Sequence, residues 1–399
     1  MGFEMIEDAN DTAFNNGTNI KVIGVGGGGG NAVEHMIASG VKGVEFICAN
    51  TDAQALKSSS SHRFIQLGRT GLGAGGKPQV GRDSAEQAQA QIRETLAGAH
   101  MLFITAGMGG GTGTGAAPVV ARIAREMGIL TVAVVTKPFE FEGSKRLGNA
   151  ENGLEELEKN VDSLIVVLNE KLLEVYGDDI SQKEAFAKAN DVLKNATGGI
   201  AEIINVPGMI NADFEDVKTV MGEPGKAMMG TAVASGADRA RLAAEQAVVC
   251  PLLDGVDLSG AKGVLVNITA DDSLKLSETR EAMNAIRAYA SPDAQIIFGT
   301  VNDPSMGDSL RVTVLATGLS RAKAAGKVAP TLTVLRTGTD AAPLSMGAAL
   351  GSAAAVESSQ IPAIWRNPRG GAPSAHVNAL MQGGMEEMEI PAFLRKQAD

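Results

Sequence analysis

The sequence is poor in aromatic residues and in cysteine, and it carries no excess of positive charge. Only 4% of its 399 residues are aromatic while 44% are hydrophobic, so we expect aliphatic cores. The formal net charge of −11 argues against general binding to nucleic acid or to an anionic membrane, since both favour a basic face. The two cysteines, Cys48 and Cys250, lie in apolar surroundings that predict buried free thiols in a reducing compartment.

Long apolar runs are also missing. No N-terminal segment has the basic-then-apolar pattern of a signal peptide, and no run reaches the ~18 residues of a membrane span. We therefore expect a cytoplasmic protein that does not insert into a membrane. Any membrane contact would then come through a partner protein.

Short apolar segments alternate with helical segments from Asn19 onward. The segments IKVIGVG, GVEFICANTD, HMLFITAGM and GILTVAVVT have the pattern of strands, and NAVEHMIASG, AEQAQAQIRETLAGA and APVVARIAREMG have the pattern of helices. This alternation predicts βαβ units and an α/β fold with a parallel sheet covered on both faces.

The second half of the chain has a different organisation. A long helical pattern covers about residues 182–204, and the strand-like runs VLVNITA, QIIFGTV and RVTVLAT that follow it predict a second, smaller α/β domain. After about Arg321 the periodic pattern is lost. We predict six parts: a flexible tail (1–18), a first α/β domain (19–181), a central helix with a connecting loop (182–212), a second domain (213–320), a disordered linker (321–384) and a charged amphipathic peptide (385–399).

The first glycine-rich loop is GVGGGGGN, residues 24–31, which follows a strand and opens a helix. Consecutive glycines let backbone N–H groups approach an anion, and the helix N-terminus adds a favourable potential. Gly24, Gly26 and Gly29 also fit the dinucleotide pattern G-x-G-x-x-G, with Asp52 where a ribose-binding acid would lie. This loop alone leaves open an NAD(P)-dependent oxidoreductase, or a tight turn that binds nothing.

The second loop is GGGTGTG, residues 109–115, again between a strand and a helix. A dinucleotide needs one pyrophosphate loop, whereas two loops at neighbouring parallel strands suit a triphosphate, with Thr112 and Thr114 available to phosphate or Mg²⁺. The motif G-x-x-x-x-G-K-[ST] is absent, so a P-loop NTPase is excluded. A third segment, GLGAGG at 71–76, could close over the same phosphates or form a mobile surface loop.

Two pairs of residues have helical spacing. Glu142 and Arg146 are four apart and would share one face of a helix, where an exposed ion pair is the ordinary interpretation. Phe186 and Asn190 have the same spacing. A lone Phe on a helix is usually part of the core, but an amide one turn away offers the donors and acceptors that the edge of a base requires.

Further polar residues follow the ends of strands or begin helices. Asn50 and Asp52 follow a strand and could reach the same crevice or form an Asx turn. The segment NADFEDV, residues 211–217, places Asp213 and Asp216 at a helix start, where acids ordinarily stabilise the helix dipole. Phosphoryl transfer also requires a group that orients the attacking water, and the phosphate loops contribute no carboxylate.

The run GGGTGTG resembles the signature of the tubulin/FtsZ family of GTPases. The segments NTDAQAL, GILTVAVVTKPFEFEG, NVPGMINADFEDVKTVM and IPAFLRKQAD extend the resemblance to about residues 20–320 and to the C-terminal peptide. It implies a parallel-sheet GTP-binding domain, a long central helix and a smaller α/β second domain that activates the GTPase. Lys77 stands where Asn is common, which could alter how tightly the third glycine loop closes.

The resemblance also implies contacts with GTP or GDP at matching positions. The ribose side would involve Glu142 and Arg146, Phe186 would stack on guanine, and Asn190 would bind its edge. The candidates on the phosphate side are Gly27, Gly28, Gly29, Gly30, Asn31, Gly110, Gly111, Thr112, Gly113 and Thr114, with Ala74 and Gly75 near the γ-phosphate and Asn50 and Asp52 beside the same crevice.

The resemblance assigns the acids to the neighbouring subunit of a filament. Asp213 and Asp216 would polarise the water or hold a cation there, with Asn211 assisting; Mg²⁺ is the expected cation, and a role for K⁺ is left open. Acids delivered only at the contact would let a monomer bind GTP and make turnover depend on assembly. Such a head-to-tail contact is heterologous and yields open filaments. A nucleotide-binding scaffold without turnover would not need these acids.

The C-terminal peptide EIPAFLRKQAD, residues 389–399, has Pro391 at a first helical position and Ile390, Phe393 and Leu394 at helical spacing. A peptide this short is either a disordered end or a segment that folds into a partner's groove. The resemblance favours binding, with membrane anchors and division regulators as partners. It also implies a contractile ring at the division site, at midcell beneath the inner membrane.

Overall fold

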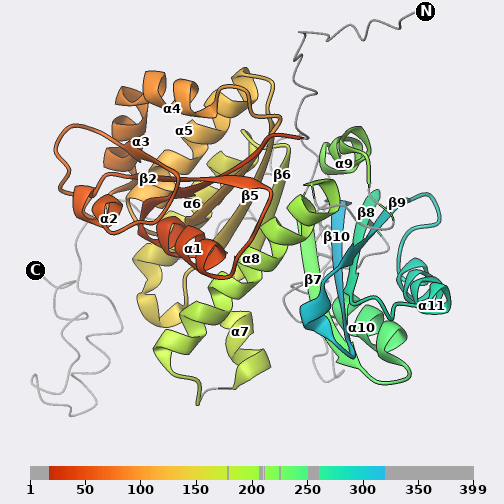
Figure 1. Ribbon diagram of the computed structural model, residues 1–399. Helices are drawn as coiled ribbons and strands as arrows, with labels where there is room; N and C mark the ends of the chain where they lie inside the picture. The colour runs from red at the N-terminus through yellow and green to blue at the C-terminus, as the bar shows by residue number, and fades with distance from the viewer. Residues whose placement is uncertain are drawn as a thin grey trace, which may run out of the picture. The chain divides into compact units, whose positions relative to one another are not determined.

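The computed structural model describes residues 18–177, 179–205, 210, 212–223, 226–249 and 260–319 (Figure 1). All of them belong to the first of two units of the chain, Met1–Val328. The predicted linker, the C-terminal peptide, Cys250 and Asn211 lie outside the described residues, as does nearly all of the predicted N-terminal tail. No helix within these ranges combines the length and the apolar character needed to cross a membrane.

The described strands form one sheet in the order β3-β2-β1-β4-β5-β6-β7-β10-β8-β9. The strands β1 to β6 pair in parallel, while β10 runs antiparallel to both β7 and β8. Between β6 and β7 only two residue pairs are in register. The strand bounds are β1 Ile20–Val25, β2 Val44–Asn50, β3 Arg63–Gln66, β4 Met101–Gly107, β5 Leu130–Lys137, β6 Ser163–Leu168, β7 Lys226–Ser235, β8 Gly263–Ala270, β9 Gln295–Asn302 and β10 Ser309–Leu319.

Helices cover both faces of the parallel part of the sheet (Figure 1). Its central strands β1 and β4 are buried along almost their whole length and consist mainly of apolar residues, because a parallel sheet is covered on both sides. One core cluster joins these strands to α1 and α8, and a second joins them to the helices of the other face. The helix bounds up to this point of the chain are α1 Gly26–Ala38, α2 Ala53–Lys57, α3 Pro78–Gln87, α4 Gln89–Leu96, α5 Thr112–Glu126, η1 Glu140–Glu142, α6 Ser144–Glu158, α7 Asn169–Tyr176 and α8 Gln182–Asn205.

The helix α8 packs against both parts of the sheet. Its last residue, Asn205, donates side-chain hydrogen bonds to the carbonyl oxygens of Thr18 (3.0 Å) and Gly43 (2.7 Å), which fixes this end of the helix. Beyond it, α10 and α11 share a third core cluster with β8 and β10. The remaining helices are α9 Phe214–Met221, α10 Arg239–Val248, α11 Leu276–Arg287 and η3 Pro304–Met306.

The predicted α/β class with a dominant parallel sheet is confirmed, and Cys48 is buried as expected. Two details of the prediction were wrong. The segment expected to be one helix, AEQAQAQIRETLAGA, belongs to two helices that meet at Ala88, whose ψ of 10° is not helical. The helices α1 and α5 also begin inside the glycine runs instead of after them. The proposed domain boundaries stay predictions.

Candidate functional site

A cavity of about 420 Å³ lies where the two glycine loops meet. The strands β1 and β4 are adjacent and parallel, so α1 and α5 begin at the same edge of the sheet. Other walls come from residues after β5 and β6 and from α8. The lining consists of Gly27, Gly28 and Asn31; Gly107, Met108, Gly110, Gly111, Thr112 and Gly113; Thr136, Pro138, Glu142, Arg146 and Asn169; and Phe186, Ala189, Asn190 and Leu193.

The glycines of these loops are of two kinds. A Cβ atom added to Gly29 would lie 2.3 Å from the carbonyl oxygen of Thr105, so no side chain fits between α1 and β4. By contrast, a Cβ on Gly27 or Gly110 would meet no atom within 4 Å. The first kind allows helix and sheet to approach closely, and the second leaves backbone exposed to the cavity.

Both helix N-termini are suited to an anion. The residues that precede them, Val25 and Gly111, make no side-chain capping bond, and neither first turn carries an acid. The N–H groups of the first turns therefore have no side-chain acceptor, and no carboxylate repels an anion there. Two such ends facing one cavity provide positive potential without lysine or arginine.

The two threonines of the second loop have different roles. Thr112 lines the cavity, and its hydroxyl lies 2.6 Å from the hydroxyl of Thr51. The hydroxyl of Thr114 instead accepts a hydrogen bond from the backbone N–H of Gly109 (2.8 Å) and is buried. Thr112 can therefore reach a ligand, whereas Thr114 fixes the shape of the loop.

The third glycine segment packs against the second loop. A Cβ on Gly111 would lie 2.8 Å from the Cβ of Ala74 and 2.9 Å from the backbone nitrogen of Lys77. The segment is thus in contact with the second glycine loop, although neither Ala74 nor Gly75 lines the cavity itself.

The opposite wall is aromatic and amide-rich. Phe186 on α8 is 39% exposed and meets the ring of Phe139 edge to face, with centroids 5.4 Å apart. Asn190 lies one turn further along α8 and also lines the cavity. Asn169 was missed by the sequence prediction: its Oδ1 is buried, borders the cavity and has no partner. The sequence did offer one indication of this residue: Asn169 comes immediately after the strand β6, at the sheet edge where the glycine loops also lie.

Glu142 and Arg146 form the ion pair that their spacing suggested, but they do not lie on one helix. Glu142 ends η1, Arg146 lies in α6, and Gly143 between them has φ of +98°, which breaks the helix. The two side chains still form an ion pair, and Glu142 also accepts a hydrogen bond from the backbone N–H of Phe139 (3.0 Å). The turn thus brings both residues to the cavity.

Several predicted residues lie near this cavity without lining it. The side chain of Asp52 caps α2. The backbone N–H of Asp52 donates a hydrogen bond to Oδ1 of Asn50 (3.2 Å), which is the Asx turn given above as the alternative. Asn50 and Gly30 line a smaller cavity of about 90 Å³ behind the first loop. None of these three residues lines the larger cavity, and neither do Gly29, Thr114, Ala74 and Gly75. Their contacts with a nucleotide therefore stay predictions.

The candidate catalytic acids lie far from the cavity. Asp213 caps α9 and accepts a hydrogen bond from the N–H of Glu215 (3.1 Å), and Asp216 is exposed in the first turn. α9 follows the far end of α8, opposite α7 (Figure 1). At a rise of 1.5 Å per residue, Asn190, which lines the cavity, lies about 22 Å along the helix axis from Asn205, the last residue of α8. The helix α9 begins beyond Asn205. The acids of one molecule therefore do not reach its own cavity.

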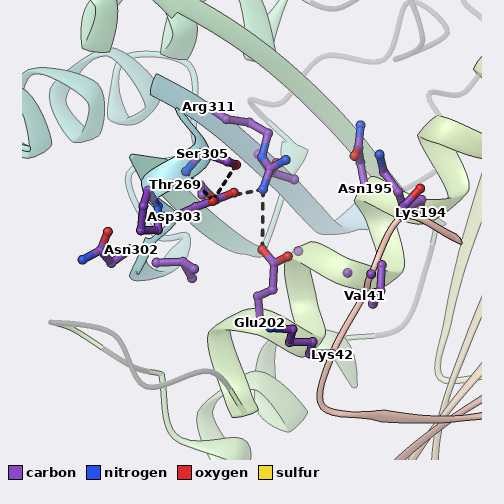
Figure 2. A pocket seen from close by; sticks show the side chains of 17 residues that line it. Val41, Lys42, Lys194, Asn195, Glu202, Thr269, Asn302, Asp303, Ser305 and Arg311 are labelled. Atoms are coloured by element: carbon purple, nitrogen blue, oxygen red, sulfur yellow. Dashed lines mark hydrogen bonds and ion pairs between the residues drawn. The ribbon is translucent and has the colours of Figure 1, made fainter. Parts of the chain in front are cut away.

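A second cavity, of about 440 Å³, lies between α8 and the strands β8 to β10. Figure 2 shows Glu202 of α8 pointing toward Arg311 of β10, with Asp303 and Lys194 nearby. The Glu202–Arg311 ion pair spans 3.6 Å, and Oε2 of Glu202 has no hydrogen-bond partner. Burial raises the pKa of the Glu202 carboxyl, against the lowering effect of the Arg311 charge. Three glycines also line this cavity, Gly40, Gly198 and Gly199, but none of them lies at the N-terminus of a helix.

Two protein-family models together match most of the described residues. The model of the GTPase domain of the tubulin/FtsZ family matches residues 19–177, and that of the FtsZ C-terminal domain matches residues 225–320. The chain is 52% identical to the cell division protein FtsZ of Pseudomonas putida over 95% of this chain and 97% of that protein. It is 57% identical to FtsZ of Buchnera aphidicola over 78% and 82% of the two chains.

Solved structures give the same result. An empty FtsZ dimer from M. jannaschii superposes with a TM-score of 0.73 at 41% identity, over 76% of this chain and 89% of that one, and a mutant FtsZ of that organism has the same score and identity. CetZ2 of Haloferax volcanii, solved as a GTPγS-bound protofilament, has a TM-score of 0.66 at 22% identity over 77% and 95% of the chains, which supports the fold alone.

Proposed function

The chain belongs to the FtsZ family of tubulin-like GTPases, and from this membership we propose that it polymerises head to tail with GTP bound between adjacent subunits. It is a cell-division GTPase, so the dehydrogenase alternative is excluded. Within the cavity, the triphosphate would lie on the N-termini of α1 and α5. Guanine would lie on the α8 wall, stacked on Phe186 and hydrogen-bonded by Asn190 and Asn169.

The observation that best supports this proposal is that α9, which bears the candidate catalytic acids, lies far from the cavity of its own molecule. The phosphate side of the cavity contains no carboxylate, and the exposed acids Asp213 and Asp216 lie beyond the other end of α8. A second molecule placed end to end would bring its α9 over the phosphates. Asp216 would then orient the attacking water, Asp213 would support it or hold a cation, and Asn211 would assist.

The cation would come with the nucleotide. The described residues contain no group of three or more His, Cys, Asp or Glu side chains that could hold a metal ion. Mg²⁺ fits a site formed mainly by phosphate oxygens with the Thr112 hydroxyl, because it keeps several waters and needs few protein ligands. It would neutralise the charge that develops on the phosphates, and K⁺ would fit beside the acids of the neighbouring subunit.

The cellular role proposed is the contractile ring at the bacterial division site. The relatives named as cell division proteins support it. Residues 389–399 would bind membrane anchors and division regulators, and the filament would assemble in the cytoplasm at midcell beneath the inner membrane. The acidic net charge favours a partner-mediated membrane contact over a direct one.

Assembly and turnover can be measured together. Sedimentation should yield polymer with GTP and Mg²⁺ but not with GDP or NAD. GTP turnover per molecule should fall steeply when the protein is diluted below the concentration at which polymer forms. A turnover per molecule that stays constant on dilution would contradict the shared site.

A mixing experiment tests whether the acids act in trans. Asp216→Ala removes the acid, and Gly110→Val places a side chain in the cavity, where an added Cβ meets no other atom. Each variant alone should hydrolyse GTP slowly. In an equal mixture, some contacts pair an intact cavity with an intact Asp216, so activity should exceed the sum of the two. Activity equal to that sum would place the acid in the same molecule as its nucleotide.

A further inference from the structure

The nucleotide cavity is built from two walls that are distant in the sequence. The wall for the phosphates includes Gly27 and Asn31 of α1, and the wall for the base includes Phe186 and Asn190 of α8. A nucleotide can use both walls at once only when they are held at the right separation. The contact between α1 and α8 therefore bears directly on how well a base is recognised.

Most of the contact between these helices is apolar. Val33 and Met36 of α1 and Leu193 of α8 are buried in the same core cluster. Apolar packing is not directional, so it allows small rotations and shifts between helices. A directional contact lies beside it: Nε2 of His35 is 2.8 Å from Oδ1 of Asp191.

This pair is close to the ligand-facing residues on both helices. His35 lies four residues after Asn31, and Asp191 is the immediate neighbour of Asn190. The two side chains are 29% and 34% exposed, so the contact is partly shielded from water. A shift of either helix that breaks this contact would also move a cavity-lining residue.

The charge around Asp191 keeps the contact in place at neutral pH. Burial raises the pKa of its carboxyl, but the hydrogen bond with His35 and the charge of Lys194 outweigh burial and leave the pKa below its ordinary value. Lys194 and Lys188 lie 3.4 and 3.9 Å from the carboxylate. The carboxylate is thus ionised and accepts a hydrogen bond from the His35 ring, whether that ring is neutral or charged.

We propose that His35 and Asp191 form a positioning pair that holds the base wall of α8 in register with the phosphate wall of α1, and so sets the preference for guanine over adenine. This rests on the proposed base contacts of Phe186 and Asn190. Without the pair, phosphates still bind at α1 and α5, but the α8 amides no longer meet the guanine edge in a fixed position. The loss falls on GDP, because adenine presents a different donor and acceptor pattern.

The test measures nucleotide preference in the full-length protein. GDP and ADP each displace a fluorescent GDP analogue from the wild type, His35→Ala, Asp191→Ala and the double variant. The preference for GDP should fall roughly three- to tenfold in each single variant, in line with the net contribution of an ordinary intramolecular hydrogen bond, because this one is partly exposed to water. The double variant should lose no more than either single one.

Two controls separate positioning from a general loss of stability. His35→Gln retains a side-chain N–H donor and should keep most of the preference. Glu245→Ala breaks a more exposed ion pair with Arg241 within α10, away from the cavity, and should leave the preference unchanged. Equal weakening of GDP and ADP in His35→Ala, or additive losses in the double variant, would overturn the proposal.

Phe186→Ala in the same assay distinguishes this inference from the proposed base site. If Phe186→Ala loses guanine preference while His35→Ala keeps it, the base site stands and the positioning pair is wrong. If Phe186→Ala keeps the preference, the base site is wrong and the positioning pair falls with it.

Discussion

The two large cavities differ little in volume, about 420 and 440 Å³, but greatly in their linings. The cavity that we propose binds the nucleotide is lined by glycine backbone and Thr112 where α1 and α5 begin. The second cavity is lined by charged side chains, among them Glu202, Asp303, Lys194 and Arg311. Backbone N–H groups bind an anion without a counter-charge that must itself be desolvated or paired. An acidic chain can hold a polyphosphate in this way.

The largest effect is expected where glycine keeps the walls of the first cavity together. Gly29→Ala places a Cβ 2.3 Å from the carbonyl oxygen of Thr105, so α1 must separate from β4. We expect a loss of about 4 kcal/mol or more in the free energy of unfolding. Thermal and denaturant unfolding measure it.

The matched control is the neighbouring glycine. Gly30 is also helical, but a Cβ there meets no atom within 4 Å. Gly30→Ala should therefore fold with unchanged or slightly higher stability, because alanine favours a helix over glycine by up to about 1 kcal/mol. Similar melting temperatures for Gly29→Ala and Gly30→Ala would show that the close packing of α1 on β4 at Gly29 does not contribute to stability as proposed.

The second prediction concerns Asp216, the acid that we propose a neighbouring molecule supplies to the phosphate side of the first cavity. Asp216→Ala should lower kcat for GTP about 100-fold, as expected for a group that orients water or transfers a proton. Nucleotide affinity should stay the same because Asp216 does not line the cavity of its own molecule. Steady-state phosphate release and GDP titration separate the two quantities. Wild-type turnover in this variant would refute the catalytic assignment.

The third prediction compares one glycine from each cavity. Gly110→Ala puts a methyl group into the nucleotide cavity without a clash and should weaken GDP binding about tenfold, or ~1.4 kcal/mol, at unchanged stability. Gly199→Ala in the second cavity adds a Cβ at ordinary contact distance, 3.6 Å from Thr313, and should leave GDP binding unchanged. Equal effects of the two on GDP affinity would remove the distinction between the cavities.

The smallest effect is expected from the charge in the second cavity. Because the pKa of Glu202 is raised in the folded protein, the folded state takes up this proton more readily than the unfolded state. As the pH falls from 7 through that raised pKa, the wild type gains stability relative to Glu202→Gln. Denaturant unfolding of both proteins across pH 4 to 7 measures the difference, and a difference that does not change with pH would contradict it.

Much of the first cavity could be predicted from the sequence because its features are local. A strand, a glycine run and a helix occupy consecutive residues at 24–31 and at 109–115, so their order alone places two helix N-termini at one sheet edge. Phe186 and Asn190 line the same cavity, as their helical spacing indicated, because both lie on the uninterrupted helix α8. Asn169 was missed because the burial of its Oδ1 without a hydrogen-bond partner depends on how the elements pack.

By itself the sequence determined the α/β class, the glycine junctions and the family, because each depends on short runs of neighbouring residues. Only the tertiary structure decided that Glu142 and Arg146 meet across a turn, that Glu202 faces Arg311, and that His35 reaches Asp191. The last two contacts join helices and strands more than a hundred residues apart. Such contacts are determined by how whole helices and strands pack together, so they cannot be predicted from the spacing of residues along the sequence.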